Sequence, residues 1–282
     1  MLLTVWDTCR LLLRRQFMQS VTSRQNPIVK TLRMLAAHPE PDGVRLLLDG
    51  VHLVHAAINA GLSFEMAAIA ASRVLDDSEE GAVARALESR GVTVVSIADR
   101  VFSAVSPVRT PTGIVAIATR TATTVETACA ASEPFVLVVL GVQDSGNLGA
   151  LLRAGEAGGI TGALIGGGGA SPFSWRALRG SMGATLRLPV ASGLDSATLL
   201  DGLARRGLRT VAAVPRHGLP PGEIDWTGGI ALVMGNEGSG LESQIVSTSS
   251  LRVTIPMARG AESLNVATAG AVLVYAAREQ RA

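Results

Sequence analysis

Short, nearly continuous hydrophobic runs alternate with amphipathic segments of helical length through the second half of the chain. Runs such as Phe135–Val142 and Ile230–Met234 lack the polar–apolar alternation of a half-exposed strand, and are typical of parallel strands covered on both faces. The pattern predicts strands at Phe135–Val142, Ala163–Gly166, Leu186–Val190, Arg209–Val214, Ile230–Met234 and Arg252–Ile255, with helices at Leu148–Ala157, Phe173–Gly183, Ser196–Arg206, Leu241–Thr248 and Leu264–Arg278. We therefore expect an α/β domain built on a parallel sheet.

The first half shows a shorter alternation of the same kind. Pro27, within Asn26–Lys30, marks a helix start, and the alternation continues to a last strand at Gly113–Ala118. The other predicted elements are strands at Arg45–Leu48, Glu65–Ala71 and Val92–Ile97 and helices at Val51–Asn59, Glu79–Ser89 and Asp99–Val105. This pattern predicts a small α/β sandwich of about a hundred residues. Thr121–Pro134 lacks a periodic apolar pattern and is interpreted as a linker.

The chain is accordingly divided into residues 1–19, an N-terminal extension; 20–120, a first domain; 121–134, the linker; and 135–282, a second domain. In the extension, Arg14 and Arg15 follow the apolar run Leu11–Leu13. A signal peptide has its positive charges before its apolar stretch, so this segment is not interpreted as one. Met18 is a candidate second start.

Composition narrows the class of protein. Hydrophobic residues make up 48% of the 282 residues and aromatic residues only 3%, so the core must consist mainly of aliphatic side chains. No apolar run approaches the length of about 18 residues that a membrane span needs. Two cysteines, Cys9 and Cys129, and four scattered histidines suggest neither a disulfide framework nor a metal site. We expect a soluble cytoplasmic protein without a metal.

Basic residues are clustered although the net charge is only +2. Arg10–Arg33 contains six basic residues and no acidic one, and Arg176, Arg179 and Arg187 form a second acid-free group. Such clusters suit contacts with nucleic-acid phosphates. A solvated helix face is the alternative interpretation of each.

Three polar, glycine-rich segments follow predicted strands: Asn147–Arg153, Met234–Leu241, and a third that runs from Ile255 to Ala267. The carboxyl ends of parallel strands are where an open α/β sheet binds its ligand. Gly166–Gly169 does not match the dinucleotide-binding pattern G-x-G-x-x-G, and no P-loop motif occurs, so ordinary Rossmann and P-loop sites are disfavoured. Each loop alone could be a structural turn.

Together, Asn-x-Gly-Ala-x-x-Arg, Met-Gly-Asn-Glu-Gly-x-Gly-Leu and Ile-Pro-Met…Glu-Ser-Leu-Asn-Val resemble the motif set of the SpoU/TrmH family, the RNA 2′-O-ribose methyltransferases of the SPOUT class. Segments 23–30, 48–54 and 102–116 resemble the SpoU substrate-binding domain, an RNA-binding fold like that of a ribosomal protein. The resemblance implies S-adenosyl-L-methionine as cofactor, a C-terminal trefoil knot, an RNA substrate and a homodimer that completes the substrate groove.

The resemblance also implies roles for individual residues. The expected cofactor-binding residues are Met234, Gly235, Ile255, Pro256 and Leu264; the catalytic set is Asn147, Arg153, Glu237, Ser263 and Asn265; and the RNA-binding residues are Arg24, Lys30, Arg176 and Arg179. A guanidinium remains protonated, so Arg153 is expected to fix a phosphate beside the target ribose and to stabilise the forming alkoxide rather than to act as a base. Asn147 and Asn265 are expected to brace the loops, and Glu237 to cap the helix that follows it.

Methyl transfer to a ribose hydroxyl requires the acceptor oxygen in line with the methyl group, and help in removing the hydroxyl proton. The expected activity is S-adenosyl-L-methionine-dependent 2′-O-methylation, with ribosomal RNA favoured over transfer RNA because of the added N-terminal domain. A non-catalytic ribosome-assembly factor on the same scaffold is the alternative from another class of protein. Protection against a ribosome-targeting antibiotic is a variant of the first hypothesis.

Overall fold

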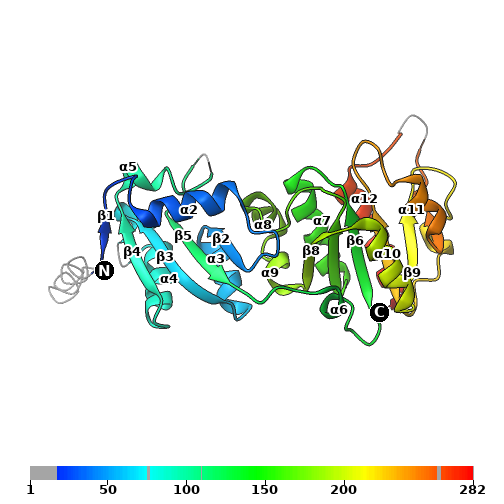
Figure 1. The fold of residues 1–282 in the computed structure, drawn as a ribbon, viewed down its shortest axis with the longest axis horizontal. Helices are drawn as coiled ribbons and strands as arrows, with labels where there is room; N and C mark the ends of the chain where they lie inside the picture. The colour runs from blue at the N-terminus through cyan, green and yellow to red at the C-terminus, as the bar shows by residue number, and fades with distance from the viewer. Residues whose placement is uncertain (1–17, 75–76, 109, 259–261, 282) are drawn as a thin grey trace. The chain divides into compact units, whose positions relative to one another are not determined.

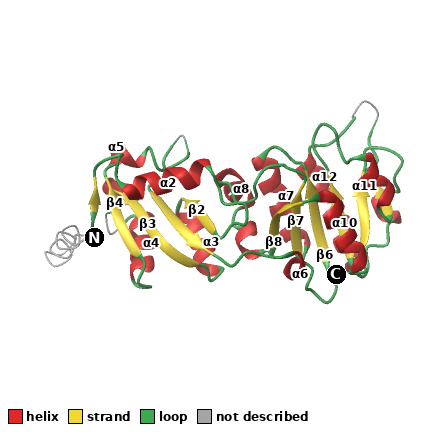
Figure 2. Cartoon of the chain, viewed as in Figure 1, coloured by secondary structure: helices red, strands yellow, loops and turns green. Residues whose placement is uncertain are grey.

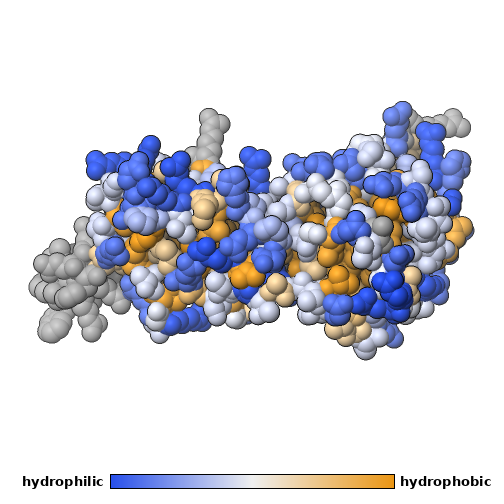
Figure 3. All heavy atoms as spheres, in the orientation of Figure 1, coloured by the Kyte–Doolittle hydropathy of each residue, from blue (hydrophilic) through white to orange (hydrophobic). Residues whose placement is uncertain are grey.

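The computed structural model describes residues 18–281 apart from 75–76, 109 and 259–261, so nearly all of the expected N-terminal extension lies outside the described residues. The chain forms two compact units, Met1–Thr121 and Ala122–Ala282, whose relative positions are not determined (Figure 1). No helix among the described residues is both long and apolar enough to cross a membrane. In the view of Figure 3, hydrophilic side chains cover much of the surface of each unit, and smaller hydrophobic patches lie among these side chains.

The first unit contains a five-stranded mixed sheet with the strand order β1-β4-β3-β5-β2. Strand β5 runs antiparallel to both of its neighbours, whereas β4 is parallel to β1 and β3. The strands are β1 (Ser20–Val21), β2 (Arg45–Asp49), β3 (Ser63–Ala70), β4 (Thr93–Ile97) and β5 (Ile114–Thr119). The two-residue strand β1 was not predicted, because a strand of that length has no readable pattern.

Helices pack against this sheet and complete the core of the first unit. They are α2 (Pro27–Ala37), α3 (Val51–Asn59), α4 (Glu79–Glu88) and α5 (Asp99–Phe102). In α2, Val29, Leu32 and Leu35 recur at helical spacing and are buried, while the intervening Lys30 and Arg33 are exposed. The side chain of Asn26 accepts a hydrogen bond from the backbone N–H of Ile28 and caps this helix, as expected at an N-cap.

The second unit contains a six-stranded sheet in which every pairing is parallel, with the order β11-β9-β10-β6-β7-β8 (Figure 2). The strands are β6 (Phe135–Leu140), β7 (Gly162–Gly166), β8 (Val190–Leu194), β9 (Arg209–Ala213), β10 (Ile230–Met234) and β11 (Leu251–Val253). Every residue of β6, β7 and β10 is buried, as the continuous hydrophobic runs predicted. The predicted fold class, α/β with a parallel sheet, is confirmed.

The strand order reverses direction between β6 and β10. From β6 the chain builds outward through β7 and β8, and then crosses to the other side to form β9, β10 and β11. Such a reversal leaves a crevice at the carboxyl ends of the two central strands, where ligands of open α/β sheets bind.

The helices of the second unit are α6 (Val125–Ala128), α7 (Ser145–Gly158), α8 (Trp175–Ser181), α9 (Ala184–Arg187), α10 (Ser196–Arg205), α11 (Ser243–Thr248) and α12 (Val266–Arg281). Glycines let three of them approach closely. A Cβ at Gly149 would meet the backbone of Ala177 in α8, and one at Gly270 of α12 would meet the side chain of Leu151 in α7. Helix α7 is therefore held between α8 and α12.

One expectation about local structure was wrong. The strand predicted at Leu186–Val190 is helix α9 followed by β8, which begins at Val190. A short apolar run of this kind has no decisive period, and Pro189, which lacks a backbone N–H, separates the two elements. The segment interpreted as a linker contains α6, whose Ala128 packs against Gly162 of β7.

Candidate functional site

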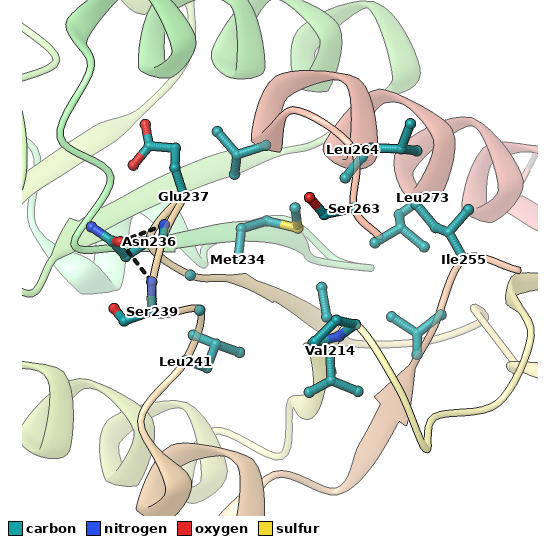
Figure 4. Close-up of a pocket in the computed structure, with 18 of the residues that line it drawn as sticks. Val214, Met234, Asn236, Glu237, Ser239, Leu241, Ile255, Ser263, Leu264 and Leu273 are labelled. Carbon is teal, nitrogen blue, oxygen red and sulfur yellow. Dashed lines mark hydrogen bonds between the residues drawn. The ribbon is translucent and has the colours of Figure 1, made fainter. Parts of the chain in front are cut away.

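A cavity of about 450 Å³ opens at the carboxyl ends of β9, β10 and β11 and at the start of α12 (Figure 4). Val214 and Pro215 line it from the end of β9, and the loop Gly235–Leu241 lines it from the end of β10. The segment after β11 contributes Ile255 and Met257. The cavity thus lies at the carboxyl edge of the parallel sheet, where open α/β sheets bind their ligands, and includes the end of the central strand β10.

The wall of the cavity has apolar and polar parts. Ile255, Leu264 and Leu273 lie on one side of the view in Figure 4, and Leu241 lies on the other side, below Ser239. Glu237 lies away from the first three, and Ser263 lies close to the Met234 side chain in this view. An apolar wall with a few placed polar groups is the usual composition of a small-molecule site.

The loop after β10 is held in one conformation by Asn236. Its side-chain oxygen accepts hydrogen bonds from the backbone N–H groups of Gly238 (2.8 Å) and Ser239 (3.1 Å), and its side-chain nitrogen donates to the carbonyl of Gly141 (2.7 Å). The backbones of Asn236 and Gly240 bond each other in both directions. One asparagine therefore closes the turn and ties it to the end of β6.

Gly235 is required by this turn. A Cβ at position 235 would lie 2.5 Å from the carbonyl carbon of Gly240 and 2.6 Å from the backbone nitrogen of Leu241. The atoms that exclude a side chain are those of the loop itself, which folds back on Gly235.

Three of the expected catalytic residues, one in the first turn of α7, one in the loop after β10 and one just before α12, are joined by hydrogen bonds. The Asn147 side-chain amide donates to Glu237 Oε1 (3.2 Å), and its oxygen accepts from the Asn265 amide (2.9 Å). Glu237 also accepts from the backbone N–H groups of Gln143 (3.1 Å) and Asp144 (3.3 Å). The chain of bonds links the carboxyl ends of β6 and β10 to the start of α12.

The expected cap by Glu237 was wrong. Glu237 bonds the segment that leads into α7, and α11 begins without a side-chain cap. Partial burial, the largest single influence, raises the pKa of Glu237, but hydrogen bonds from Gln143, from its own backbone, from Asn147 and from Asp144 together lower it below its ordinary value. The structure thus favours the ionised carboxylate, which accepts all of these bonds.

Helices α7 and α12 both start at this site. Asp144 caps α7 by accepting from the N–H of Asn147 (2.7 Å), and Asn265 accepts from the N–H groups of Ala267 (2.9 Å) and Thr268 (3.3 Å) at the start of α12. Asn147 and Asn265 were expected to brace loops through side chain–backbone bonds. Asn265 does so, and the two side chains also bond each other.

Arg153 is placed apart from this network. It is an exposed residue of α7 and lies more than two turns from the helix start at Ser145. Among the described residues, no hydrogen-bond or ion-pair partner is found for its guanidinium. Its charge is therefore available to a ligand.

The expected site residues are distributed as follows. The cavity is lined by six of them: Met234, Gly235, Glu237, Ile255, Ser263 and Leu264. Pro256 is exposed and is not among the lining residues, and Asn147 and Asn265 join the site through hydrogen bonds to Glu237 and to each other. Arg24 and Lys30 are exposed in the first unit, and Arg176 and Arg179 are exposed on α8 in the second.

Several lining residues were not anticipated from the sequence, among them Val214, Ser239, Leu241, Met257, Ala269 and Leu273. Val214 is the last residue of a predicted strand and directly follows the observed strand β9, which was a usable signal. Ala269 and Leu273 carried no signal, because only the packing of α12 decides which of its faces meets the cavity. No group of three or more metal-ligating side chains occurs in the described part of the chain.

Models of known protein families match both units of the chain. Residues 134–275 match the family described as SpoU rRNA Methylase, and residues 26–116 match the MRM3-like substrate binding domain. The 23S rRNA (guanosine(2553)-2′-O)-methyltransferase RlmP of Bacillus subtilis (strain 168) is 30% identical over 92% of this chain and 98% of its own length.

Solved structures are similar over both units. A crystal structure of an RNA 2′-O ribose methyltransferase is 29% identical, with a TM-score of 0.78 over 93% of this chain and 99% of that one. An AdoMet-bound rRNA methyltransferase from Sinorhizobium meliloti is 25% identical, with a TM-score of 0.79 over 93% of this chain and 98% of that one.

Proposed function

Because the chain belongs to the SpoU rRNA Methylase family, we propose that it transfers a methyl group from S-adenosyl-L-methionine to a ribose 2′-hydroxyl of ribosomal RNA. The protein is an enzyme, an RNA 2′-O-ribose methyltransferase. The observation that carries this conclusion is the three-loop site at the carboxyl ends of β6 and β10, joined by Asn147, Glu237 and Asn265. The relative with a ribosomal RNA target matches this chain through both units, which favours ribosomal over transfer RNA.

The cavity fits the cofactor in size and chemistry. Its volume of about 450 Å³ lies within the range of roughly 300–1,000 Å³ common for small-molecule sites. Ile255 and Leu264 offer an apolar wall for a purine, while Ser239 and Ser263 offer hydroxyl groups. S-adenosyl-L-methionine supplies an electrophilic methyl group. We assign Met234, Gly235, Ile255, Pro256 and Leu264 to holding it.

Arg153 is the candidate catalytic residue. Its exposed guanidinium has no partner among the described residues, so it can bind the phosphate beside the target ribose without breaking an existing ion pair. A fixed positive charge there also stabilises negative charge that develops on the ribose oxygen. Because guanidinium does not release its proton, Arg153 does not act as the base.

Glu237, Asn147 and Asn265 fix the positions of the segments after β6 and β10 and before α12 relative to one another. We therefore assign them to positioning rather than to proton transfer. The Glu237 side chain accepts from the Asn147 amide and from the backbone N–H of Gln143, and the Asn147 oxygen accepts from the Asn265 amide. Ser263 lines the cavity two residues before Asn265. We propose that its hydroxyl contacts the substrate or the cofactor next to the reacting atoms.

We propose that residues 20–120 bind RNA and that residues 135–282 form the methyltransferase domain. The matched substrate binding domain supports the first assignment. Exposed Arg24 and Lys30 in the first unit, and Arg176 and Arg179 on α8, are assigned to phosphate contacts. Residues 121–134 connect the two domains and also cover the end of β7 through α6.

The remaining proposals concern topology, assembly and location. We propose that α12 completes a trefoil knot; in support, the segment before it lines the same cavity as Val214 and the loop after β10. A homodimer that completes the substrate groove is proposed on the family resemblance, and light scattering that finds a monomer at working concentrations would contradict it. Its ribosomal RNA substrate supports a cytoplasmic location.

Mapping of methylated riboses tests the function. In ribosomal RNA from cells without the gene, one ribose should lose its 2′-O-methyl group, and the wild-type gene should restore it while the Arg153→Ala gene does not. A methyl group lost from transfer RNA would establish the alternative substrate. Unchanged methylation in both kinds of RNA would support the non-catalytic assembly factor instead.

A further inference from the structure

Trp175 differs from the other described tryptophan in its surroundings. Trp226 is completely buried, and its indole N–H donates to the carbonyl of Pro221 (2.9 Å). Trp175 is only half-buried at the first position of α8, in a chain in which aromatic residues make up 3% of the total. Large aromatic side chains are enriched where a protein surface contacts another molecule, so a partly exposed tryptophan is a candidate contact site.

A guanidinium lies over this ring. The central carbon of the Arg176 guanidinium is 5.1 Å from the centroid of the Trp175 ring, within the range of a cation–π contact. Two other arginines in the second unit lie over aromatic rings, but each also donates to backbone carbonyls: Arg278 to Ala157 and Arg281 to Trp226. For the guanidinium of Arg176, no hydrogen-bond acceptor is found among the described residues.

The chain segment that contains the pair carries basic residues but no acidic ones. No acidic residue occurs between Glu156 and Asp195 in the sequence, and Arg179 is exposed one turn after Arg176 on α8. No ion pair is found for Arg179 within the described chain. Other arginines of this unit, Arg187 and Arg209 among them, are paired with carboxylates. The charges beside Trp175 are therefore free for an anionic ligand.

Helix packing connects this surface to the proposed reaction site. Helices α7 and α8 cross where Gly149 meets Gly180: a Cβ at Gly180 would lie 3.4 Å from the Cα of Gly149. Arg153 and Arg176 each lie four residues, about one helical turn, from that crossing. The ring and its guanidinium thus belong to the same rigid helix pair as Asn147 and Arg153.

We infer that Trp175 and Arg176 form a stacking platform for an unpaired base of the substrate RNA, next to the target nucleotide. The inference rests on the proposed function. Proteins that bind single-stranded RNA stack its bases on aromatic rings and on guanidinium planes, while nearby cations hold the phosphates. The platform supplies the flat surfaces, and the charge of Arg176 adds to that of Arg179 and Arg153 in holding the phosphates. The substrate is therefore single-stranded at this position rather than a continuous duplex.

Binding of a short unstructured RNA of roughly twelve nucleotides to the full-length protein tests the platform. Trp175→Ala should weaken binding about 5- to 100-fold, because one base loses its stacking partner. The dependence of affinity on salt should not change, since no charge is removed. Arg179→Gln is the matched control, because it should weaken binding and reduce the salt slope by about one unit. Trp175→Phe, which keeps an aromatic ring, should retain most of the affinity.

Abasic substitution along the same RNA locates the stacked base. Removal of one base should weaken binding to the wild type but not to Trp175→Ala, so that the two changes are not additive. Equal affinity of wild type and Trp175→Ala, additivity at every position, or a change of oligomeric state in Trp175→Ala on light scattering would overturn the inference. Calorimetry with S-adenosyl-L-methionine separates this failure from failure of the proposed function, because cofactor binding does not involve Trp175.

Discussion

Individual residues of the candidate site have two different roles. Asn147, Glu237 and Asn265 have their polar atoms engaged with one another and with the backbone, so their contribution is to the geometry of the loops. Arg153 makes no such bond among the described residues and is exposed. A side chain that carries a charge without a partner, on the helix that begins at the site, is the better candidate for contact with substrate.

Replacement of Arg153 tests that assignment. Arg153→Ala should reduce turnover by about two to three orders of magnitude, because loss of one preorganised donor costs roughly 3–4 kcal/mol of transition-state stabilisation. Affinity for S-adenosyl-L-methionine, measured by calorimetry, should remain nearly unchanged. Arg153→Lys should recover little activity, since an ammonium cannot reproduce the planar fork. Full activity in the alanine variant would remove Arg153 from the mechanism.

Protonation of Glu237 should loosen the site in acid. The folded state lowers the pKa of Glu237, so its stabilising contribution is present above the ordinary carboxyl pKa of about 4.3 and is lost as pH falls through the lower folded value. Glu237→Gln places an amide donor against N–H donors and should be less stable than wild type at neutral pH. In urea unfolding, this difference should shrink as the pH is lowered toward about 3. A difference that does not vary with pH would contradict the assignment of an ionised carboxylate.

The motifs in the sequence draw attention to these residues, but the sequence could not give their hydrogen-bond partners. Asn147 is 90 positions from Glu237 and 118 from Asn265, so both hydrogen bonds depend on how three strands are ordered in the sheet. The prediction that Glu237 caps the next helix followed local sequence and was wrong for this reason. Local capping by Asp144 and Asn26, in contrast, uses contacts two or three residues away.

At the scale of elements, the loop after β10 depends on a glycine at its first position. Gly235→Ala would force a Cβ to within 2.5 Å of the Gly240 backbone, which has no side chain that could move aside. We expect a loss of about 1–3 kcal/mol in the free energy of unfolding, together with weaker cofactor binding. Denaturant unfolding and calorimetry measure the two effects.

The control lies in the same loop. At Gly238 the nearest atom to an added Cβ, the side-chain oxygen of Asn236, is 3.5 Å away, an ordinary contact. Gly238→Ala should therefore change stability by no more than about 0.5 kcal/mol. Equal effects of the two substitutions would mean that the turn does not constrain Gly235.

Helix α12 offers a direct way to fill the cavity. Ala269 lines it, whereas Thr268, the preceding residue, is exposed and is not among the lining residues. Ala269→Phe should reduce affinity for S-adenosyl-L-methionine by at least about tenfold by occupying its space, while Thr268→Phe should leave the affinity nearly unchanged. Tight binding by Ala269→Phe would place the cofactor elsewhere.

Most elements could be predicted because their patterns are strong. The strands β6, β7 and β10 are buried throughout, and their continuous hydrophobic runs mark them in the sequence. Predictions failed where apolar spacing fits both helix and strand, as at Ala184–Arg187, or where an element is very short, as at β1. The strand order of either sheet could not be read from hydrophobicity, because it depends on how the chain crosses between strands.

The whole molecule combines a unit matched to a substrate binding domain with a unit matched to the SpoU rRNA Methylase family, in which we propose the cofactor site. Neither unit alone holds the basic residues. The net charge is +2, and exposed basic residues occur in both units. We expect RNA affinity to fall with increasing salt through a limited number of phosphate contacts rather than through general attraction. The central claim, methylation of a ribose hydroxyl, concerns the chemistry of the product.

The most direct test is to incubate the protein with unmodified ribosomal RNA and S-adenosyl-L-methionine labelled on its methyl group, and then to hydrolyse the RNA in alkali. A 2′-O-methyl group removes the hydroxyl that attacks the neighbouring phosphodiester, so the label should appear in an alkali-resistant dinucleotide. Arg153→Ala should give little label there. Label recovered in mononucleotides would mean that a base is methylated, and that result would contradict the account.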